Sequence, residues 1–404
     1  MGAALEWHHR GMDAVELREL LTPEALGLLD SLGPSTTTGD AVALVSRLRR
    51  EGHSPARVAA VLTQYRLRRR AVSKFGPFAE RMLFTQSGLE QASRLRVAAL
   101  HAGRFSAAGL SRVADLGCGI GGDAMAIAAL DLTVTAVERD EVTAAIASYN
   151  LAPWPTALVV HGDALEQSLD DIDGLWLDPA RREGVTRLTS PDDWSPSLDE
   201  VLSLARRLPS GIKLAPGMPR NLIPDDVEAQ WVSIDGEVVE LVLWTGALAR
   251  AGVGRAALVL RGDEPAAELR AASDSVDVEA GDLGEYLYEP DGAVIRARLI
   301  GDLARQLQGR MLDPTIAYIT ADRVQPTPFA RAFRVLERFP LDVKVLVREL
   351  AHREIGVLEI KKRGVDIDPA ALRPRLKLRG ANSAVLVLTR IAGERVALLA
   401  ERAD

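Results

Sequence analysis

A glycine-rich turn is the segment of this sequence with the plainest capacity to hold a ligand. Residues 113–123 read V-A-D-L-G-C-G-I-G-G-D and place glycine at Gly117, Gly119 and Gly121. Because glycine lacks a Cβ, these positions can adopt positive φ and let a ligand approach the backbone closely. Such a run alone fits dinucleotide binding as well. Asp115, two positions before the first glycine, favours instead a ligand that carries an amino group.

Two more acids follow the next two apolar runs in order. Glu138 ends the run 133–137, 21 residues after Gly117, where a carboxylate can accept hydrogen bonds from both hydroxyls of a ribose. Asp163 follows the run 157–160 and is placed to accept from an adenine amino group. Aspartate after glycine is also a common turn residue, so a turn role for Asp163 stays open beside the ligand role.

Asp178 and Pro179 end the fourth apolar run and mark the expected reaction site. In an open α/β sheet, ligands bind beyond the carboxyl ends of the strands, which is where Asp178 falls. Pro179 biases Asp178 toward an extended backbone that can turn carbonyl groups outward. Such acceptors can hold an amine for attack on an electrophile, a task of alignment more than of acid–base chemistry. The alternative is an Asp-Pro pair that merely ends a strand, but its place after four strands in order favours the reaction site.

The residues around these side chains predict a parallel α/β sheet, because short apolar runs alternate with amphipathic segments. The expected strands are residues 113–116, 133–137, 157–160, 174–177 and 211–214, and the expected helices are residues 123–130, 141–150 and 198–208. Two further runs, 231–234 and 238–244, flank a short turn with Asp235-Gly236 and therefore form an antiparallel hairpin. A sheet that ends in a hairpin differs from the all-parallel sheet of dehydrogenases.

The region before the sheet reads as helical. Apolar residues spaced by three and four predict several helices within residues 1–85, one of which starts at Ser54-Pro55 with a side-chain cap and a first-turn proline. A further helix is expected over residues 89–102. We therefore expect a helical N-terminal domain at 1–85 and the α/β domain at 86–247.

The region after the sheet begins with a small, glycine- and alanine-rich stretch, residues 245–254, which reads as a linker. Beyond it, strands and helices are mixed, which predicts a C-terminal α+β domain at 255–404. The expected strands are residues 256–261 and 384–389, and the expected helices are residues 299–307 and 327–337.

Composition is that of an ordinary globular protein. The 404 residues contain 47% hydrophobic and 26% charged side chains, and no apolar run approaches the roughly 20 residues that span a bilayer. Because the N-terminus lacks the pattern of a signal peptide, a cytoplasmic location is expected and no membrane partner. Cys118 is the only cysteine, and the six histidines show no ligand spacing, so no metal is expected.

Basic residues are concentrated in two stretches although the formal net charge is −7. Nine of them lie between Arg47 and Lys74, and seven lie between Lys361 and Arg379. Local positive charge is what contacts to nucleic-acid phosphates require, whatever the total charge. Two solvated surfaces are the alternative interpretation.

Four stretches give the chain a family resemblance: residues 84–93 (F-T-Q-S-G-L-E-Q-A-S), the glycine motif, residues 177–181 (L-D-P-A-R), and residues 356–369 with 376–380 (G-V-L-E-I-K-K-R-G-V-D-I-D-P and L-K-L-R-G). With these the sequence resembles the class I S-adenosylmethionine-dependent methyltransferases that carry a C-terminal THUMP-like domain. Its core is also similar to the trimethylguanosine synthase group. The resemblance covers most of the chain from residue 75 onward and implies S-adenosylmethionine as cofactor and, through the THUMP-like domain, RNA as partner.

The resemblance also implies roles that the residues alone do not. Phe84 and Thr85 would cover the cofactor, although a plain core role for Phe84 is equally open. Relatives that methylate amino groups usually follow the acid with two prolines and an aromatic residue, whereas this chain has Asp178-Pro179-Ala180-Arg181. Arg181 could stack on a base or hold a phosphate, and Trp194 could supply the missing ring, so the target atom stays open.

The leading hypothesis from the sequence is therefore a methyltransferase that acts on a base nitrogen in tRNA or rRNA. A small-molecule methyltransferase is the first alternative, in which case both basic stretches are solvated surfaces. A non-catalytic RNA-binding module is the second.

Overall fold

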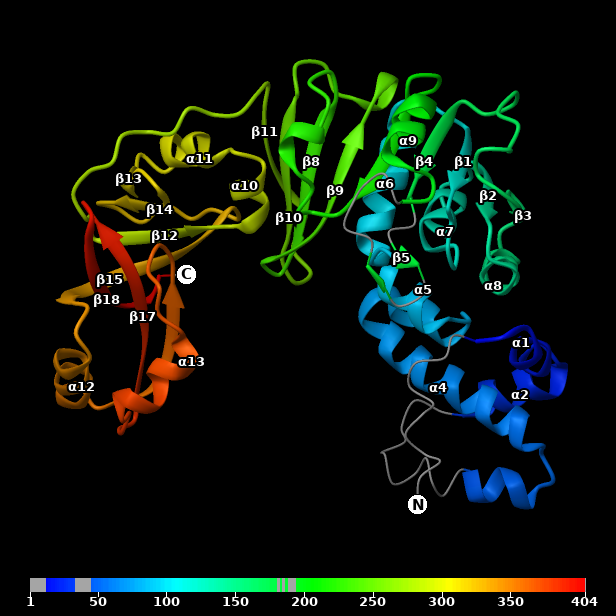
Figure 1. Cartoon of the computed structure of the whole chain (residues 1–404), viewed down its shortest axis with the longest axis horizontal. Helices are drawn as coiled ribbons and strands as arrows, with labels where there is room; N and C mark the ends of the chain where they lie inside the picture. Colours follow the sequence, from blue (N-terminus) through cyan, green and yellow to red (C-terminus); the bar gives the residue numbers. More distant parts are fainter. Residues whose placement is uncertain (1–11, 33–44, 180–181, 184–185, 188–193, 404) are drawn as a thin grey trace. The chain divides into compact units, whose positions relative to one another are not determined.

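The computed structural model describes residues 12–32, 45–179, 182–183, 186–187 and 194–403, which Figure 1 colours along the chain. The chain divides into two compact units. The first comprises Met1–Lys213 with Trp244–Leu248, and the second comprises Leu214–Leu243 with Ala249–Asp404.

Five parallel strands form the framework of the first unit. They are β1 (Arg112–Leu116), β2 (Thr133–Glu138), β3 (Ala157–His161), β4 (Gly174–Leu177) and β7 (Ser210–Leu214). β1 pairs with β2 and β4, β3 pairs with β2, and β7 pairs with β4, all in parallel. Every residue of β4 and β7 is buried, as is typical of parallel strands covered on both faces. Each predicted strand lies within one residue of the observed one. A separate antiparallel pair is formed by β5 (Arg182–Glu183) and β6 (Thr186–Arg187).

Three helices connect these strands where they were predicted: α7 (Gly122–Ala128), α8 (Glu141–Leu151) and α9 (Leu198–Ala205). Each has a local reason to start. Gly121 precedes α7 in the left-handed region, the Asp140 carboxylate accepts from the Thr143 backbone N–H, and Ser197 begins a capping box at α9.

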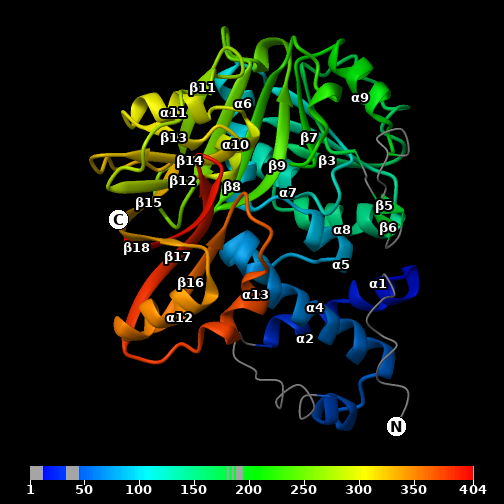
Figure 2. The ribbon, with the colours of Figure 1, turned by 60° about the vertical axis from the view of Figure 1, so that its left-hand side comes forward.

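Helices also make up the N-terminal part of the first unit. They are α1 (Ala14–Leu20), α2 (Pro23–Ser31), α4 (Pro55–Phe75), η2 (Gly76–Glu80), α5 (Gln86–Gln91) and α6 (Leu95–Ala107). α1 and α2 pack against the long helix α4, as Figures 1 and 2 both show. α4 starts at Pro55 with Ser54 as its cap, which confirms the predicted start.

The single helix predicted over residues 89–102 is wrong, because the chain breaks between α5 and α6. Ala92 and Arg94 have extended backbones, with ψ of 139° and 136°. Between them the Ser93 hydroxyl donates to the Asp123 carboxylate at 2.9 Å. A specific tertiary hydrogen bond thus interrupts a run whose apolar spacing alone is helical.

Aromatic rings fill the core beside β4 and β7. The rings of Phe105, Trp176 and Trp244 have centroids 5.8–6.5 Å apart. Gly211 of β7 leaves room for them, since a Cβ there would lie 2.7 Å from ring atoms of both tryptophans. This cluster fixes the two strands that end at the expected reaction site.

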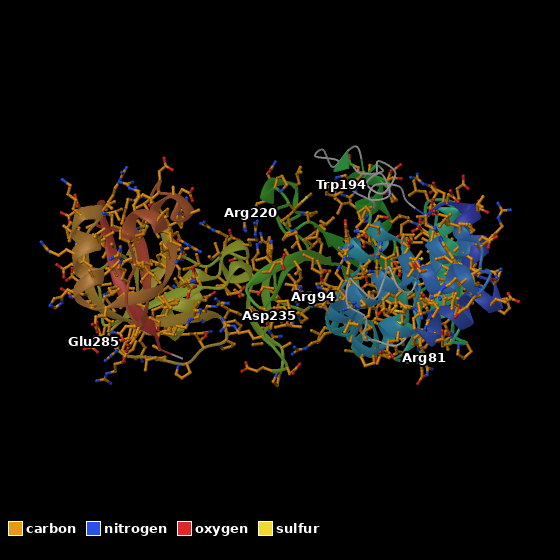
Figure 3. All side chains as sticks on the ribbon, turned by 90° about the horizontal axis from the view of Figure 1, so that it is seen from below. Arg81, Arg94, Trp194, Arg220, Asp235 and Glu285 are labelled. Carbon is orange, nitrogen blue, oxygen red and sulfur yellow. The ribbon has the colours of Figure 1, made fainter. Side chains whose placement is uncertain are left out.

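Among the described residues a nine-stranded sheet has the order β11-β10-β8-β9-β7-β4-β1-β2-β3. The neighbours β8 (Glu228–Ile234) and β9 (Glu237–Trp244) are joined by Asp235 and Gly236, which have φ of 53° and 90°. Two residues with positive φ are typical of a type I′ turn, so this is the predicted antiparallel hairpin. Asp235 is labelled at this turn in Figure 3. The hairpin and the parallel strands together confirm the predicted fold class.

Two strands of the second unit follow the hairpin in this sheet. β10 (Arg255–Leu260) pairs in parallel with β8, and β11 (Ala267–Ala271) pairs antiparallel with β10. The predicted strand at residues 256–261 is therefore part of the large sheet. The domain bounds given above stay a prediction.

The rest of the second unit is built on a seven-stranded sheet with the order β13-β14-β12-β15-β18-β17-β16. Its strands are β12 (Tyr286–Pro290), β13 (Arg310–Asp313), β14 (Ile316–Ala321), β15 (Ala330–Pro340), β16 (Ile355–Lys362), β17 (Asn382–Ile391) and β18 (Glu394–Arg402). Its helices are α10 (Gly292–Arg296), α11 (Ile300–Gln306), α12 (Val343–His352) and α13 (Pro369–Leu372), the last followed by η6 (Arg373–Leu376). Figure 2 shows α12 and α13 beside β16, and leucines of these helices share one core cluster with Leu358 of β16.

The helix predicted over residues 327–337 is wrong, because these residues contribute to the strand β15. β15 pairs antiparallel with β12 on one side and with β18 on the other. Ala332 and Phe333 are both buried, and the register shifts between Val335 and Glu337. The irregular burial at this bulge imitates helical spacing, while strand partners distant in sequence decide the conformation.

In the parts of the chain that the structure describes, no helix is both long and apolar enough to cross a membrane.

Candidate cofactor and reaction site

The glycine turn between β1 and α7 is closed on one side and open on the other. Gly117, Gly119 and Gly121 have φ of 90°, 55° and 85°, which confirms the expected positive values. A Cβ on Gly117 would lie 2.7 Å from the Asp178 carbonyl oxygen, whereas a Cβ on Gly119 would meet nothing within 4 Å. Cys118 between them is buried, and burial raises the pKa of its thiol well above the ordinary value, as suits a packing residue. The turn thus presents Gly119 as its accessible position.

Asp115 is the most unusual side chain of the site. It is 1% exposed, and neither carboxylate oxygen has a hydrogen-bond partner within the structure. Burial raises the pKa of Asp115 well above its ordinary value of 3.8, and the neighbouring carboxylates of Asp123 and Asp178 raise it further. A buried acid without a donor is costly, so its presence fits a ligand that brings a positively charged amino group.

Glu138 holds the glycine turn from the end of β2. One of its carboxylate oxygens accepts from the Gly119 N–H at 3.0 Å, and the other accepts from the Asp140 N–H at 2.9 Å. A carboxylate has about four lone-pair sites, so these two bonds leave it capacity for hydroxyl donors. Its position at the strand end agrees with the predicted ribose-binding role.

Asp163 lies at the end of β3 and takes part in a turn. Its Oδ1 accepts from the Leu165 backbone N–H at 2.9 Å. This is the turn role left open by the sequence, and the adenine-binding role stays a prediction. Asp163 is also the one predicted acid that is absent from the charges acting on Asp115, which are Asp123, Asp178, Lys213 and Glu138.

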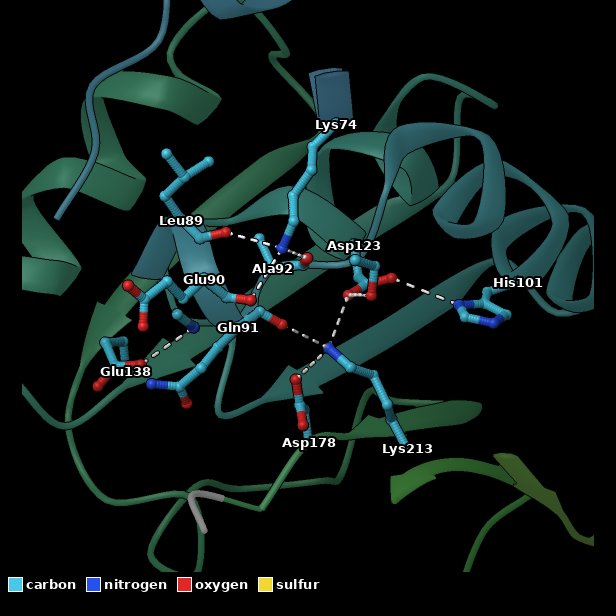
Figure 4. Close-up of polar contacts among 12 residues, drawn as sticks. Lys74, Leu89, Glu90, Gln91, Ala92, His101, Asp123, Glu138, Asp178 and Lys213 are labelled. Carbon is cyan, nitrogen blue, oxygen red and sulfur yellow. Dashed lines mark hydrogen bonds and ion pairs between the residues drawn. The ribbon is translucent and has the colours of Figure 1, made fainter. Parts of the chain in front are cut away.

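Asp178 and Lys213 are brought together by the register of two parallel strands. Leu177, the last residue of β4, pairs with Ile212 of β7, and Asp178 and Lys213 each follow this pair directly in the chain. The Lys213 Nζ lies 2.5 Å from Asp178 Oδ2, and the two side chains are 5% and 23% exposed. Figure 4 shows the ammonium group between the Asp178 and Asp123 carboxylates. Pro179, next along the chain, is buried.

A buried polar network continues from Lys213. Its ammonium group also donates to the Gln91 carbonyl at 3.4 Å and lies 3.8 Å from Asp123. Asp123 accepts from Ser93 and lies 3.4 Å from His101 Nδ1. Burial opposes ionisation of Asp123, but Lys213, His101 and Ser93 together lower its pKa.

These network residues were not predicted as functional. Lys213 was placed in the strand 211–214, where a lone lysine among apolar neighbours was a signal that the sequence offered. Asp123 was the last residue of the glycine motif but received no role. Their partners Ser93 and His101 come from distant segments, and nothing in the sequence spacing points to them.

Phe84 and Thr85 lie in the segment that leads to α5. Phe84 is fully buried with its ring 5.7 Å from that of Phe75, and the Gln64 side chain bonds both its N–H and its carbonyl. Phe84 thus packs in the core, and its role in covering the cofactor stays a prediction. Thr85 caps α5 through the Gly88 N–H at 2.9 Å.

The segment leading to α5 is also attached to the glycine turn. Asn150 of α8 bonds the Leu83 N–H, the Leu83 carbonyl and the Ile120 carbonyl. Gly88 of α5 contacts the turn so closely that a Cβ there would lie 2.4 Å from the Ile120 side chain.

The sequence suggested Arg181 and Trp194 as residues that could stack on a base. Arg181 lies outside the described residues. Trp194, labelled in Figure 3, is 7% exposed and so offers little ring surface. No group of three or more histidine, cysteine or acidic side chains suited to a metal ion occurs in the described part of the chain.

Parallel strands followed by an antiparallel hairpin, with a glycine turn and acids at or near consecutive strand ends, define the class I, Rossmann-like methyltransferase fold. The crystal structure of a proposed methyltransferase from Porphyromonas gingivalis W83 shares this fold, with a TM-score of 0.71 at 20% identity over 97% of this chain and all of that one.

Relatives in sequence establish the family. The chain is 34% identical over 334 residues to an uncharacterised S-adenosylmethionine-dependent methyltransferase of Mycobacterium tuberculosis, found in strains CDC 1551 and H37Rv, and the match covers 80% of this chain and 90% of the relative. The chain therefore belongs to the S-adenosylmethionine-dependent methyltransferases, and S-adenosylmethionine is its cofactor. Residues 330–402 match the THUMP domain-like family, and residues 13–71 match a domain of unknown function.

Proposed function

We propose that this protein methylates a nitrogen atom of a base in RNA, with tRNA or rRNA as substrate. The observation that carries the proposal is the position of Asp178 directly after β4. Its side-chain carboxylate is partly exposed, and its backbone carbonyl oxygen lies beside the glycine turn. The similarity of the core to the trimethylguanosine synthase group remains part of this proposal.

Each acid at or near a strand end would bind a different part of the cofactor. Asp115 would hold the amino group, because its buried carboxylate lacks a donor. Glu138 would bind the ribose hydroxyls, Asp163 would accept from the adenine amino group, and Gly119 would lie against the ligand. Phe84 and Thr85, in the segment before α5, would cover the cofactor. When bound, S-adenosylmethionine supplies an electrophilic methyl group for direct displacement by a nucleophile.

Asp178 and Pro179 would bind the target nitrogen. An ionised Asp178 accepts a hydrogen bond from an N–H of the base and so aims the nitrogen lone pair at the methyl group. Pro179 restricts the backbone of Asp178 and helps to fix that direction. Arg181, which follows closely in sequence, would stack on the base or pair with a phosphate.

Exposed basic residues near the C-terminus support RNA as the partner. Within the region matched to the THUMP domain-like family, Arg375 on η6, Lys377 and Arg379 shortly after it and Lys362 at the end of β16 are exposed. We call these four residues the η6 basic patch. Such a cluster can neutralise phosphates of a nucleic acid. The three-domain division at 1–85, 86–247 and 255–404 is part of the same proposal.

The N-terminal basic stretch gives weaker support, because some of its charges serve the fold. Arg68 is buried and pairs with Asp30 at 2.8 Å. Lys74 donates to three carbonyls at the end of α5, those of Leu89, Glu90 and Ala92. The exposed Arg66 and Arg69 remain candidates for phosphate contacts.

The test is transfer of labelled methyl groups from S-adenosylmethionine to bulk RNA that lacks its native modifications. Wild-type protein should label the RNA, Asp178→Ala should not, and nucleoside analysis would then identify the atom. Arg207→Glu, a charge change on an exposed residue at the end of α9, serves as the control and should retain activity. Cofactor binding without label in any RNA would refute RNA methylation and would favour a small-molecule substrate or a non-catalytic role.

A further inference from the structure

We propose that Lys213 is a positioning residue, which keeps Asp178 ionised and fixed in direction at the reaction site. This inference rests on the proposed function, because it assigns Asp178 to the target nitrogen. It concerns a residue in the interior of the sheet that the cofactor-binding and target-binding roles above leave without a function.

The geometry puts Lys213 behind Asp178. The Lys213 side chain is only 5% exposed, whereas Asp178 reaches the surface of the site with 23% of its side chain exposed. The 2.5 Å contact between Nζ and Oδ2 is a short charge-assisted hydrogen bond. The two residues come directly after the paired residues Leu177 and Ile212 of β4 and β7, which brings their side chains to the same end of the two strands.

The charges around Asp178 explain why a cation is needed there. The carboxylates of Asp123 from α7, Asp178 just after β4 and Glu138 from β2 all act to raise the pKa of Asp115 from β1. Among the described residues that act on Asp115, Lys213 is the cation, and His101 of α6 adds a second titratable group beside Asp123. Without Lys213, mutual repulsion and burial would favour protonation of these carboxyl groups. A protonated Asp178 would lose one of its acceptor sites for a target N–H.

Lys213 also connects the reaction site to α5 through the Gln91 carbonyl. Lys74 provides a natural control, because it donates to three other carbonyls at the end of the same helix. Replacement of either lysine weakens the end of α5, but of these two variants Lys213→Met is the one that removes the ammonium group shown 2.5 Å from Asp178. A comparison of the two variants therefore separates support of the helix from control of the carboxylate.

The experiment is a carboxyl titration by carbon-13 NMR on the full-length protein with labelled aspartate, in which Asp178→Asn identifies the Asp178 signal. In Lys213→Met, Asp178 should take up its proton about 1–3 pH units higher than in the wild type, as expected when an opposite charge is removed. Lys213→Arg, which retains the charge, should restore most of the wild-type titration. Lys74→Met should leave it unchanged.

Three outcomes would overturn the proposal: an unaltered Asp178 titration in a folded Lys213→Met, an equal shift in Lys74→Met, or no rescue by Lys213→Arg. If Lys213→Met does not fold, the ion pair between Lys213 and Asp178 can be tested by replacing Asp178 instead. The Lys213 ammonium signal is compared in the wild type and Asp178→Asn, and loss of the carboxylate should let Lys213 release its proton at lower pH. An unchanged Lys213 titration would refute the pair.

These titrations need no substrate, so they distinguish failure of this proposal from failure of the proposed function. A confirmed ion pair with no methyl transfer to RNA would leave Lys213 in its role for another substrate. Where transfer to RNA occurs, Lys213→Met should move the acid limb of the kcat/KM profile to higher pH by the shift seen in the titration. Lys74→Met should leave that limb in place.

Discussion

Asp115 and Asp123 lie at the two ends of one glycine turn, yet their pKa values are shifted in opposite directions. Burial raises the pKa of Asp115, and the carboxylates nearby add to the effect. Burial acts on Asp123 as well, but Lys213, His101 and Ser93 outweigh it and lower the pKa. The difference follows from hydrogen-bond partners: Asp123 has donors, whereas the oxygens of Asp115 have none among the described residues. An acid left in this condition is poised for a cationic ligand.

Replacement of Asp115 by asparagine should therefore stabilise the ligand-free protein and abolish cofactor binding. Between the ordinary pKa of 3.8 and the raised one, the folded chain holds a proton that the unfolded chain has released, so stability falls as pH rises through that window. Asparagine does not ionise and avoids this loss, a gain of about 1–3 kcal/mol near neutral pH on the scale of an unsatisfied buried polar group. Urea unfolding and calorimetric titration with S-adenosylhomocysteine measure the two effects, and Asp115→Asn that binds normally would contradict the assigned role.

Cofactor binding by the wild type should become tighter as pH rises. A cationic amino group favours the ionised form of Asp115, so binding below the raised pKa releases a proton, and affinity increases with pH until that carboxyl group is ionised in the free protein. Titration calorimetry in two buffers of different ionisation enthalpy would measure the proton release. An affinity that is flat or falls over the acidic range would show that Asp115 does not face the ligand.

Two glycines of the turn should respond differently to alanine. Both have positive φ, which costs an L-residue roughly 1–2 kcal/mol. Gly117→Ala adds a clash with the Asp178 carbonyl 2.7 Å away and should destabilise the protein by more than this amount. Gly119→Ala meets open space, so it should cost only the backbone strain while it weakens cofactor binding. Equal losses of stability in urea unfolding would argue against the close approach at Gly117.

The η6 basic patch should contribute salt-sensitive affinity for RNA. Lys377→Glu and Arg379→Glu should each weaken binding and lower the slope of log affinity against log salt by up to about one. Arg207→Glu is the charge-matched control and should leave that slope unchanged. Filter binding at several salt concentrations would measure it. Slopes that fall equally in patch and control variants would indicate a general charge effect rather than a contact surface.

The strands and their acids could be predicted because each strand is a short apolar run whose end carries a distinctive residue. Asp115, Glu138 and Asp178 follow from that pattern and the strand order. Lys213 could not be assigned, since its role depends on Asp178 in the adjacent strand, 35 residues earlier. The break at Ser93 and the strand β15 were also missed, because a distant hydrogen bond and distant strand partners decide them.

The hydrogen bonds of Asn150 limit where the chain can be truncated. Asn150 is 3% exposed, and its amide uses three hydrogen bonds to join the backbone before α5 to the glycine turn. The segment that ends at Leu83 is thus hydrogen-bonded through Asn150 to the glycine turn. Removal of Leu83 would leave the buried Asn150 amide without two of its hydrogen-bond partners. A segment grafted from another protein would have to supply equivalent partners. A truncation or graft that is meant to preserve the glycine turn should therefore keep Leu83 together with Asn150.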